Sequence, residues 1–351
     1  MSTNKLLYGL GLIGAFSTGA STVNATEVKV YGKALASVAN FSTSEADQSG
    51  TKLSTSGSRF GIKATEKIND MYTAFAKYEF SVDLTGAGTT IGNRGQYVGL
   101  GTTFGDIMMG FADTPYKKAK FELFGDTFAD QNSLLSKGIE RRGENMVGFK
   151  SKDYSGFSLY AQYSDSTQSD FAGSNSYASV SLTYNMKPVK IMIAQDNISR
   201  GAASADDGTG TIVTTDYDAI VANKVVIVGT FGATKAGLTY EMIDDTTKDS
   251  KSDDRTNMAL GVKHKMGEWE LGLEHIMRGA SAADNSKDEA TQSSFAAKRH
   301  LSEKFSYYVL LSSLTNGEAG TLSPKAFPSD MTKGTAKEAY TTAGVSMVFK
   351  F

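Results

Sequence analysis

Apolar and polar residues alternate at every second position along most of this chain, and this period of two constrains the fold more than any other feature. In the stretch 72–83, one parity holds Tyr72, Ala74, Ala76, Tyr78, Phe80 and Val82, and the other holds Thr73, Phe75, Lys77, Glu79, Ser81 and Asp83. The stretches 157–164 and 268–274 separate in the same way. Such alternation is typical of a β-strand with two different faces. The sequence therefore predicts an all-β fold.

Turn-forming residues divide the chain into segments joined alternately by short turns and long polar loops. Seven short turns are predicted at 67–70, 103–106, 152–156, 185–188, 233–237, 265–268 and 301–304. Eight longer loops are predicted at 42–51, 85–92, 113–140, 166–173, 197–216, 245–254, 279–291 and 315–339. Fifteen connections join sixteen strands, and short turns opposite long loops are typical of outer-membrane barrels. Because backbone in lipid must satisfy its hydrogen bonds internally, we predict a closed, sixteen-stranded, antiparallel transmembrane β-barrel.

The end of the chain supports a lipid-facing last strand. Ala343, Val345, Met347, Phe349 and Phe351 place an apolar side chain at every second position. A secreted soluble β-helix or propeller is the competing interpretation, but no repeat of fixed period is visible to support it.

Composition excludes several other classes of protein. The 351 residues carry 36 Lys and Arg against 38 Asp and Glu, so no basic excess favours nucleic-acid binding. The absence of cysteine removes disulfides, thiolate metal sites and cysteine nucleophiles. A mean hydropathy of -0.26 argues against a bundle of membrane helices but not against strands that are apolar on alternate residues only.

The first 25 residues have the features of a secretory signal peptide. Lys5 precedes an apolar run at 6–16, and small residues lead to Val23-Asn24-Ala25. A formal GxGxxG match at 9–14 has no preceding strand, so it does not predict a dinucleotide site. We expect residues 1–25 to be cleaved and residues 26–351 to form the barrel.

Several short motifs resemble the Gram-negative trimeric porins, the general diffusion channels of the outer membrane. The matching stretches are Val30-Tyr31-Gly32-Lys33, Ser58-Arg59-Phe60-Gly61-Ile62-Lys63, residues 93–100, Glu122-Leu123-Phe124-Gly125-Asp126-Thr127, residues 142–149 and the terminal Phe351. The resemblance implies a homotrimer in outer-membrane lipid, in the outer membrane of a Gram-negative bacterium. It also implies a water-filled pore through which small hydrophilic solutes and ions diffuse passively.

The resemblance further implies that the third long loop, 113–140, folds into the barrel and constricts the pore. It assigns the acidic side of this constriction to Glu122 and Asp126, with Asp113 and Asp130 as weaker contributors. It assigns the basic side to Lys33, Arg59, Arg94 and Arg142, and Lys63 lies on the same face as Arg59.

Strand parity supports part of this assignment independently. Lys33 opposes the apolar parity of Val30, and Arg59 and Lys63 oppose that of Ile62, so these cations are expected to face water in the lumen. Arg94 shares parity with apolar residues, and there the resemblance alone places it. The other lumen charges are expected only to solvate the wall (Lys77, Glu79, Glu270, Glu274 and Arg278).

Two alternatives to a general diffusion channel remain. A solute-specific channel would need a file of lumen aromatic residues, and those at 31, 75 and 160 are scattered. A mainly structural or adhesive barrel is the second. An enzyme is not expected, because His264 and His275 share parity with lipid-facing residues and His300 has no partner at a telling spacing. No cofactor or structural metal is expected, although the acidic stretches at 206–208 and 244–254 could hold divalent cations.

Overall fold

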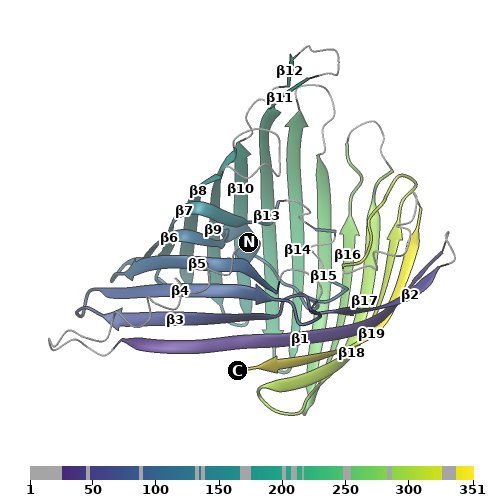
Figure 1. Cartoon of the computed structure of the whole chain (residues 1–351), viewed down its shortest axis with the longest axis horizontal. Helices are drawn as coiled ribbons and strands as arrows, with labels where there is room; N and C mark the ends of the chain where they lie inside the picture. Colours follow the sequence, from purple (N-terminus) through teal and green to yellow (C-terminus); the bar gives the residue numbers. More distant parts are fainter. Residues whose placement is uncertain are drawn as a thin grey trace.

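Antiparallel strands form one sheet whose first strand pairs with its last, so the sheet closes into a barrel (Figure 1). The computed structural model describes residues 26–44, 48–86, 90–130, 134–135, 139–166, 175–199, 203–206, 212–215, 217–247, 254–282, 287–325 and 337–351. The predicted signal peptide lies outside these residues, as do most residues of the acidic stretches at 206–208 and 244–254.

The strands follow one another around the barrel in chain order. Their bounds are β1 Glu27–Thr43, β2 Ser49–Ser54, β3 Arg59–Lys67, β4 Thr73–Val82, β5 Ile91–Gly101, β6 Gly105–Asp113, β7 Arg142–Ser151, β8 Phe157–Ser166, β9 Asn175–Met186, β10 Val189–Ser199, β11 Ala203–Asp206, β12 Ile212–Thr215, β13 Tyr217–Phe231, β14 Thr234–Thr247, β15 Arg255–Met266, β16 Trp269–Arg278, β17 Ala290–His300, β18 Phe305–Asn316 and β19 Ala339–Lys350. Within the described ranges, no helix has the length and apolar character needed to cross a membrane.

Sixteen strand positions make up the barrel wall in the described part of the chain. The main sheet holds 17 strands, but β2 and β3 both pair with β1 and together occupy one position. The hairpin β11–β12 forms a separate sheet within the loop predicted at 197–216. The prediction of a sixteen-stranded antiparallel barrel is confirmed.

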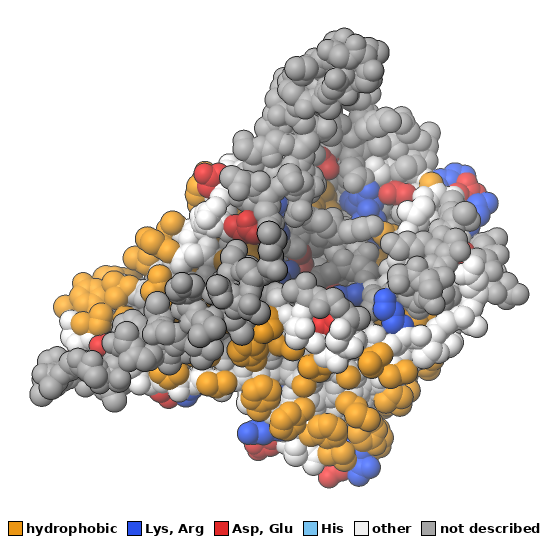
Figure 2. All heavy atoms as spheres, viewed as in Figure 1, with side chains coloured by type: hydrophobic (Ala, Val, Ile, Leu, Met, Phe, Trp, Pro, Cys, Tyr) orange, Lys and Arg blue, Asp and Glu red, His pale blue; other side chains and the backbone are white. Residues whose placement is uncertain are grey.

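The two parities of the strands separate as the alternation predicts. On β4, Phe80 lies on the outside and stacks on Phe60 of β3, with ring centroids 5.4 Å apart. Val30 and Val98 expose 64% and 60% of their surface on the outside. Figure 2 shows hydrophobic side chains gathered on the outer surface and Lys and Arg side chains around the central hollow. This arrangement suits a wall with lipid on one side and water on the other.

The last strand closes the barrel against the first. β19 pairs with β1 over a register that joins Ala34 to Phe349 and Thr43 to Tyr340. Beyond β19, the backbone of Phe351 exchanges hydrogen bonds with Gly32, at 2.9 and 3.2 Å. The alternate apolar residues at 343–351 are therefore the outer face of the closing strand, as predicted.

One predicted turn is wrong by several residues. The turn expected at 233–237 is a two-residue connection at 232–233, with Gly232 at a φ of 57°. Gly237 lies inside β14, where a Cβ would come within 2.3 Å of the Phe121 ring. This glycine makes room for a side chain of the 113–140 segment, and the sequence alone could not separate that role from a turn.

Candidate functional site

The segment between β6 and β7 lies inside the barrel in those of its parts that the structure describes. Phe124, Phe128 and Leu134 belong to one buried apolar cluster with Leu35 and Phe41, whose side chains point inward from β1. The Phe128 ring packs edge-on against Phe41 at 6.1 Å between centroids. The segment thus packs against apolar side chains on the lumen side of β1, which would otherwise face water.

A short helix begins the segment and is fixed to the opposite wall. The helix, α2 (Pro115–Lys118), is capped by Thr114, whose hydroxyl accepts a hydrogen bond from the amide of Lys117. Tyr116 is fully buried and donates its hydroxyl hydrogen to Glu241 Oε1 of β14 at 2.6 Å. Since Tyr116 amide nitrogen also donates to Ser179 on β9, the start of the segment has two polar anchors.

Inward-facing polar residues of β13 to β17 hold the rest of the segment. These contacts join Leu123 N to Glu274 Oε1 (3.1 Å), Arg278 Nη1 to Leu134 O (3.1 Å), Gln292 Nε2 to Ala129 O (2.9 Å) and Lys224 Nζ to Glu140 Oε1 (2.8 Å). The expectation that Glu274 and Arg278 only solvate the wall is therefore wrong. Alternation identifies which side chains point inward, but it cannot show that backbone groups of another segment will meet them.

Asp126 is the acidic residue that meets the predicted basic wall directly. Its Oδ2 lies 2.7 Å from Lys33 Nζ and 3.4 Å from Arg59 Nη1. Lys33 and Arg59 are register partners on β1 and β3, so their side chains reach the lumen side by side. Burial opposes ionisation of the Asp126 carboxyl, but the charges of Lys33, Arg94 and Arg59 outweigh it and hold its pKa well below the usual range.

The backbone around Asp126 is shaped to bring its carboxylate to the wall. Asp126 itself has a φ of 67°, and Gly57, between β2 and β3, has a φ of 79°. A Cβ on Gly57 would come within 2.2 Å of the Asp126 carboxyl carbon. The break between β2 and β3 therefore leaves the space that this carboxylate occupies.

Glu122 has a different partner from the one the resemblance implied. Its Oε2 lies 2.8 Å from Lys120 Nζ of the same segment, and among the described residues none of the five predicted cations pairs with it. Burial, and then the negative charge of Asp130, raise the pKa of the Glu122 carboxyl to about 7, against the opposing charge of Lys120. Glu122 is thus a carboxyl group that titrates near neutral pH.

Arg94 faces the lumen because of a β-bulge. Gly95 is the register partner of Glu79 and Asn93 that of Phe80, so Arg94 is the extra residue between them. This irregularity explains why its parity matched that of apolar residues in the sequence. Arg94 Nε lies 2.9 Å from Glu79 Oε1.

Glu79 gathers three further side chains that sequence reasoning did not connect. Its Oε2 accepts a hydrogen bond from the Tyr31 hydroxyl at 2.8 Å and lies 3.1 Å from Lys77 Nζ. The expectation that Lys77 and Glu79 only solvate the wall is wrong in this respect. A usable signal existed, because the neighbours of Glu79 on both adjacent strands are glycines, Gly61 and Gly95, which leave space for long side chains to reach it.

The remaining predicted cations lie close to this group. Arg142, at the start of β7, has its Nε 3.0 Å from Asp113 Oδ1, and Lys118 Nζ lies 2.8 Å from the other carboxylate oxygen. Lys63 Nζ lies 5.0 Å from the centre of the Tyr31 ring, at cation–π distance. Asp113, expected to contribute weakly, is therefore the direct partner of a predicted basic residue.

Together these residues form what we call the lumen cluster. It contains the carboxylates of Glu79, Asp113 and Asp126 and the cations of Lys33, Arg59, Lys63, Lys77, Arg94, Lys118 and Arg142. Cations outnumber carboxylates within it, so its local charge is positive although the whole chain carries -2. Charges fixed on the wall of a water-filled lumen can attract and orient polar solutes. Within the described ranges, no group of His, Asp and Glu side chains is arranged to hold a metal ion.

Comparison with known proteins decides the family. A family model described as Gram-negative porin matches residues 11–319. This chain belongs to that family. Major outer membrane protein P.IA of Neisseria meningitidis serogroup B (strain MC58) is 29% identical over 150 residues, which cover 41% of this chain and 38% of the relative. The serogroup C form is 33% identical over 118 residues, covering 32% and 30%. The matches thus span well under half the length of these relatives.

Solved porin structures share the fold. An anion-selective porin from Comamonas acidovorans superimposes with a TM-score of 0.75 at 20% identity, over 93% of this chain and 100% of that one. OmpT of Vibrio cholerae, in its trimer form, gives a TM-score of 0.68 at 16% identity, over 93% and 100%. The family, the names of the relatives and the barrel place this porin in the outer membrane of a Gram-negative bacterium. They point to a channel.

Proposed function

We propose that this porin forms a water-filled channel through which small hydrophilic solutes and ions diffuse passively across the outer membrane. The observation that carries the proposal is a closed barrel, apolar outside, whose lumen holds an inward segment beside a charged wall. Most of the outward side chains are apolar and suit contact with lipid, and solutes meet the polar inward ones. No energy source is required, since solutes move down their own gradients.

The segment 113–140 narrows this channel, and the lumen cluster lines the narrow part. Asp126 of the segment is ion-paired with Lys33 and Arg59 of the wall, at 2.7 and 3.4 Å, so the passage runs beside this contact. Arg94, Arg142 and Lys63 extend the basic side, and Glu122 contributes an acidic group from within the segment. Solutes are selected by size and by the electrostatic field of the charges that line this part of the channel.

The excess of cations in the lumen favours anions modestly. The lumen cluster is positive, and further inward-facing lysines lie on other strands (Lys150, Lys190, Lys235, Lys298 and Lys350). The Comamonas porin with the same fold is anion-selective, which agrees with this direction. Because carboxylates stand directly against several of the cations, the preference is expected to be weak.

The working form is a homotrimer. Gly32, Ala34 and Ala36 give the outer side of β1 a surface of small residues that suits close packing of a second barrel. A row of outward register partners on β17, β18, β19 and β1 is polar instead of apolar (Ser293, Ser313, Thr341 and Ser42). A polar strip on the outer face is better accommodated against another protein surface than against lipid. OmpT of Vibrio cholerae also occurs as a trimer.

The chain acts as a channel and not as an enzyme. His275 Nδ1 lies 2.8 Å from Ser293 Oγ, and His264 Nδ1 lies 2.8 Å from Thr234 Oγ1, both on the outer surface. Among the described residues, neither imidazole has a carboxylate or carboxamide on its second nitrogen to orient it as a catalytic base.

We also propose that residues 1–25 are removed on export. N-terminal sequencing of the mature protein is therefore expected to begin at Thr26.

Planar-bilayer recording tests the channel directly. The folded protein is expected to insert with discrete conductance steps in KCl. In parallel, liposomes that contain it should swell in sugars at rates that fall with sugar size. Folding is checked independently by β-sheet circular dichroism. A folded barrel that gives neither conductance steps nor swelling would overturn the proposed function.

A further inference from the structure

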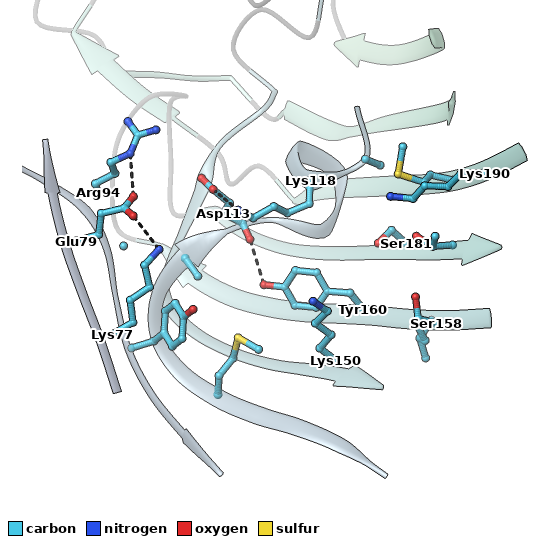
Figure 3. Close-up of a pocket in the computed structure, with 18 residues that line it drawn as sticks. Lys77, Glu79, Arg94, Asp113, Lys118, Lys150, Ser158, Tyr160, Ser181 and Lys190 are labelled. Carbon is cyan, nitrogen blue, oxygen red and sulfur yellow. Dashed lines mark hydrogen bonds and ion pairs between the residues drawn. The ribbon is translucent and has the colours of Figure 1, made fainter. Parts of the chain in front are cut away.

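A cavity of about 390 Å³ lies between the inner wall of β4 to β10 and the start of the 113–140 segment (Figure 3). Its lining combines lysines with aromatic and thioether side chains, among them Lys150, Lys190, Tyr160 and Met192. The volume corresponds to a small organic molecule, and all of these side chains point inward from neighbouring strands.

Two of the lysines in this cavity have no acidic partner in the part of the chain that the structure describes. Glu79 pairs with Lys77 and Arg94, and Asp113 pairs with Lys118, so these two carboxylates offset part of the charge of the three cations. Lys150 and Lys190, in contrast, form no ion pair with any described residue, and Figure 3 shows both at the cavity without a marked interaction. Five cations therefore line the cavity against two carboxylates, and these two ammonium groups are the ones that no described carboxylate pairs with.

The positive charges also repel one another. Lys150 and Lys235 both lie near enough to Lys190 to act electrostatically on its ammonium group. Like charges gathered in a confined part of the lumen raise the local potential, and a bound anion relieves the repulsion. Two unpartnered ammonium groups match a ligand with two negative charges better than one with a single charge.

An ordered aromatic surface lies beside these lysines. Lys150 and Tyr160 are register partners on β7 and β8. The Tyr160 hydroxyl is within 3.1 Å of Asp113 O and 2.9 Å of Gln162 Oε1, which fixes the orientation of the ring. Met192 lies two residues after Lys190 on the same inward face of β10, and its thioether side chain is suited to contact with a flat ring.

We propose that this cavity is a binding site for small aromatic dicarboxylates, a solute class for the channel proposed above, on which the inference rests. The two carboxylates meet Lys150 and Lys190 through charge-assisted hydrogen bonds. The ring lies against Tyr160 and Met192. The site slows these solutes in the lumen and raises their local concentration, which favours their passage over that of neutral solutes of equal size.

The test is calorimetric titration of phthalate into the folded, detergent-solubilised protein, with KCl conductance of the same preparation measured in parallel. Saturable binding is expected, and Lys150→Gln with Lys190→Gln should weaken it by roughly tenfold or more. The matched control is Lys298→Gln with Lys350→Gln, which removes two lumen ammonium groups at a separate cavity. It should weaken binding less than about threefold, as loss of general lumen charge would.

Further ligands and one further variant test the chemistry of the site. Succinate, which lacks the ring, and benzyl alcohol, which lacks the charges, are both expected to bind more weakly than phthalate. Tyr160→Leu should weaken phthalate but not succinate. Absence of phthalate binding, equal losses in the two lysine pairs, or equal binding of succinate and phthalate would each overturn the proposal. Because binding is measured without ion flow, phthalate binding in a protein that gives no conductance would contradict the channel but not the site.

Discussion

Lys33 Nζ lies 2.7 Å from Asp126 Oδ2, so one ion pair joins the first strand of the barrel to a segment 93 residues later in the chain. Arg59 shares the same carboxylate oxygen at 3.4 Å. A single carboxylate thus neutralises part of two cations on adjacent strands and ties the inner segment to the wall. The position of this segment and the charge of the lumen are therefore set by the same contact.

Replacing the Asp126 carboxylate is expected to change both the stability of the folded protein and the charge of the lumen. Asp126→Asn leaves Lys33 and Arg59 without their shared anion, so permeability should shift toward anions in reversal-potential measurements under a salt gradient. Stability should fall by about 1.5–3 kcal/mol, the usual contribution of hydrogen bonds to charged groups. Asp70→Asn is the control, because Asp70 is an exposed turn residue whose one ion pair among the described residues is with Lys67. A larger effect from the control on the reversal potential would contradict the assignment.

The basic side should respond in the opposite direction. Arg59→Ala combined with Arg142→Ala removes two cations from the lumen cluster, which should shift permeability toward cations and raise single-channel conductance. Glu122→Ala with Asp126→Ala should shift it toward anions. Loop charges are screened beyond about 8 Å at physiological salt. If neither pair moves the reversal potential while substitutions of the acids at 244–254 do, the narrow part of the channel lies elsewhere.

Ion preference should depend on pH near neutrality. Burial and Asp130 raise the pKa of Glu122 to about 7, so below pH 7 this group is neutral and above it carries a negative charge. Anion preference should thus be stronger at pH 6 than at pH 8. The folded state binds this proton more tightly than the unfolded chain, so the associated stability is lost as pH rises through 7. In Glu122→Gln the step in reversal potential between pH 6 and 8 should disappear; its persistence would assign the titration to another group.

The sequence predicts which face of each strand meets water, but not which charges meet. The alternation places Phe80 on the outer face and Glu79 on the inner face correctly. Whether a side chain prefers lipid or water depends on its own chemistry, which the sequence states. Arg94 could not be placed in this way, since a bulge changes parity through backbone geometry. Glu274 and Arg278 point inward as expected, but their partners are backbone groups of a segment distant in the chain.

Lys224 holds the far end of the 113–140 segment, and its substitution tests the strength of this contact. Its side chain is 1% exposed and its ammonium lies 2.8 Å from Glu140, which is 4% exposed, and 3.5 Å from Glu241. Lys224→Met removes the nearest cation from two buried carboxylates, so the free energy of unfolding should fall by about 3–5 kcal/mol and open-channel current noise should increase. The matched change Lys263→Met breaks a half-exposed pair with Glu270 and should cost less than about 1 kcal/mol. Thermal unfolding that ranks the two variants in reverse order would refute this anchor.

Single-cysteine modification tests most directly whether the 113–140 segment narrows the conducting path. The chain has no cysteine, so Asp126→Cys introduces one reactive thiol, and Val98→Cys provides a control on the outer surface. A negatively charged, membrane-impermeant thiol reagent is added while single-channel current is recorded, and its attachment is verified by mass. We predict a stepwise, irreversible drop in the conductance of Asp126→Cys channels and no change for Val98→Cys. Full modification of Asp126→Cys with unchanged conductance would contradict the account, because it would show that ions do not pass beside this residue.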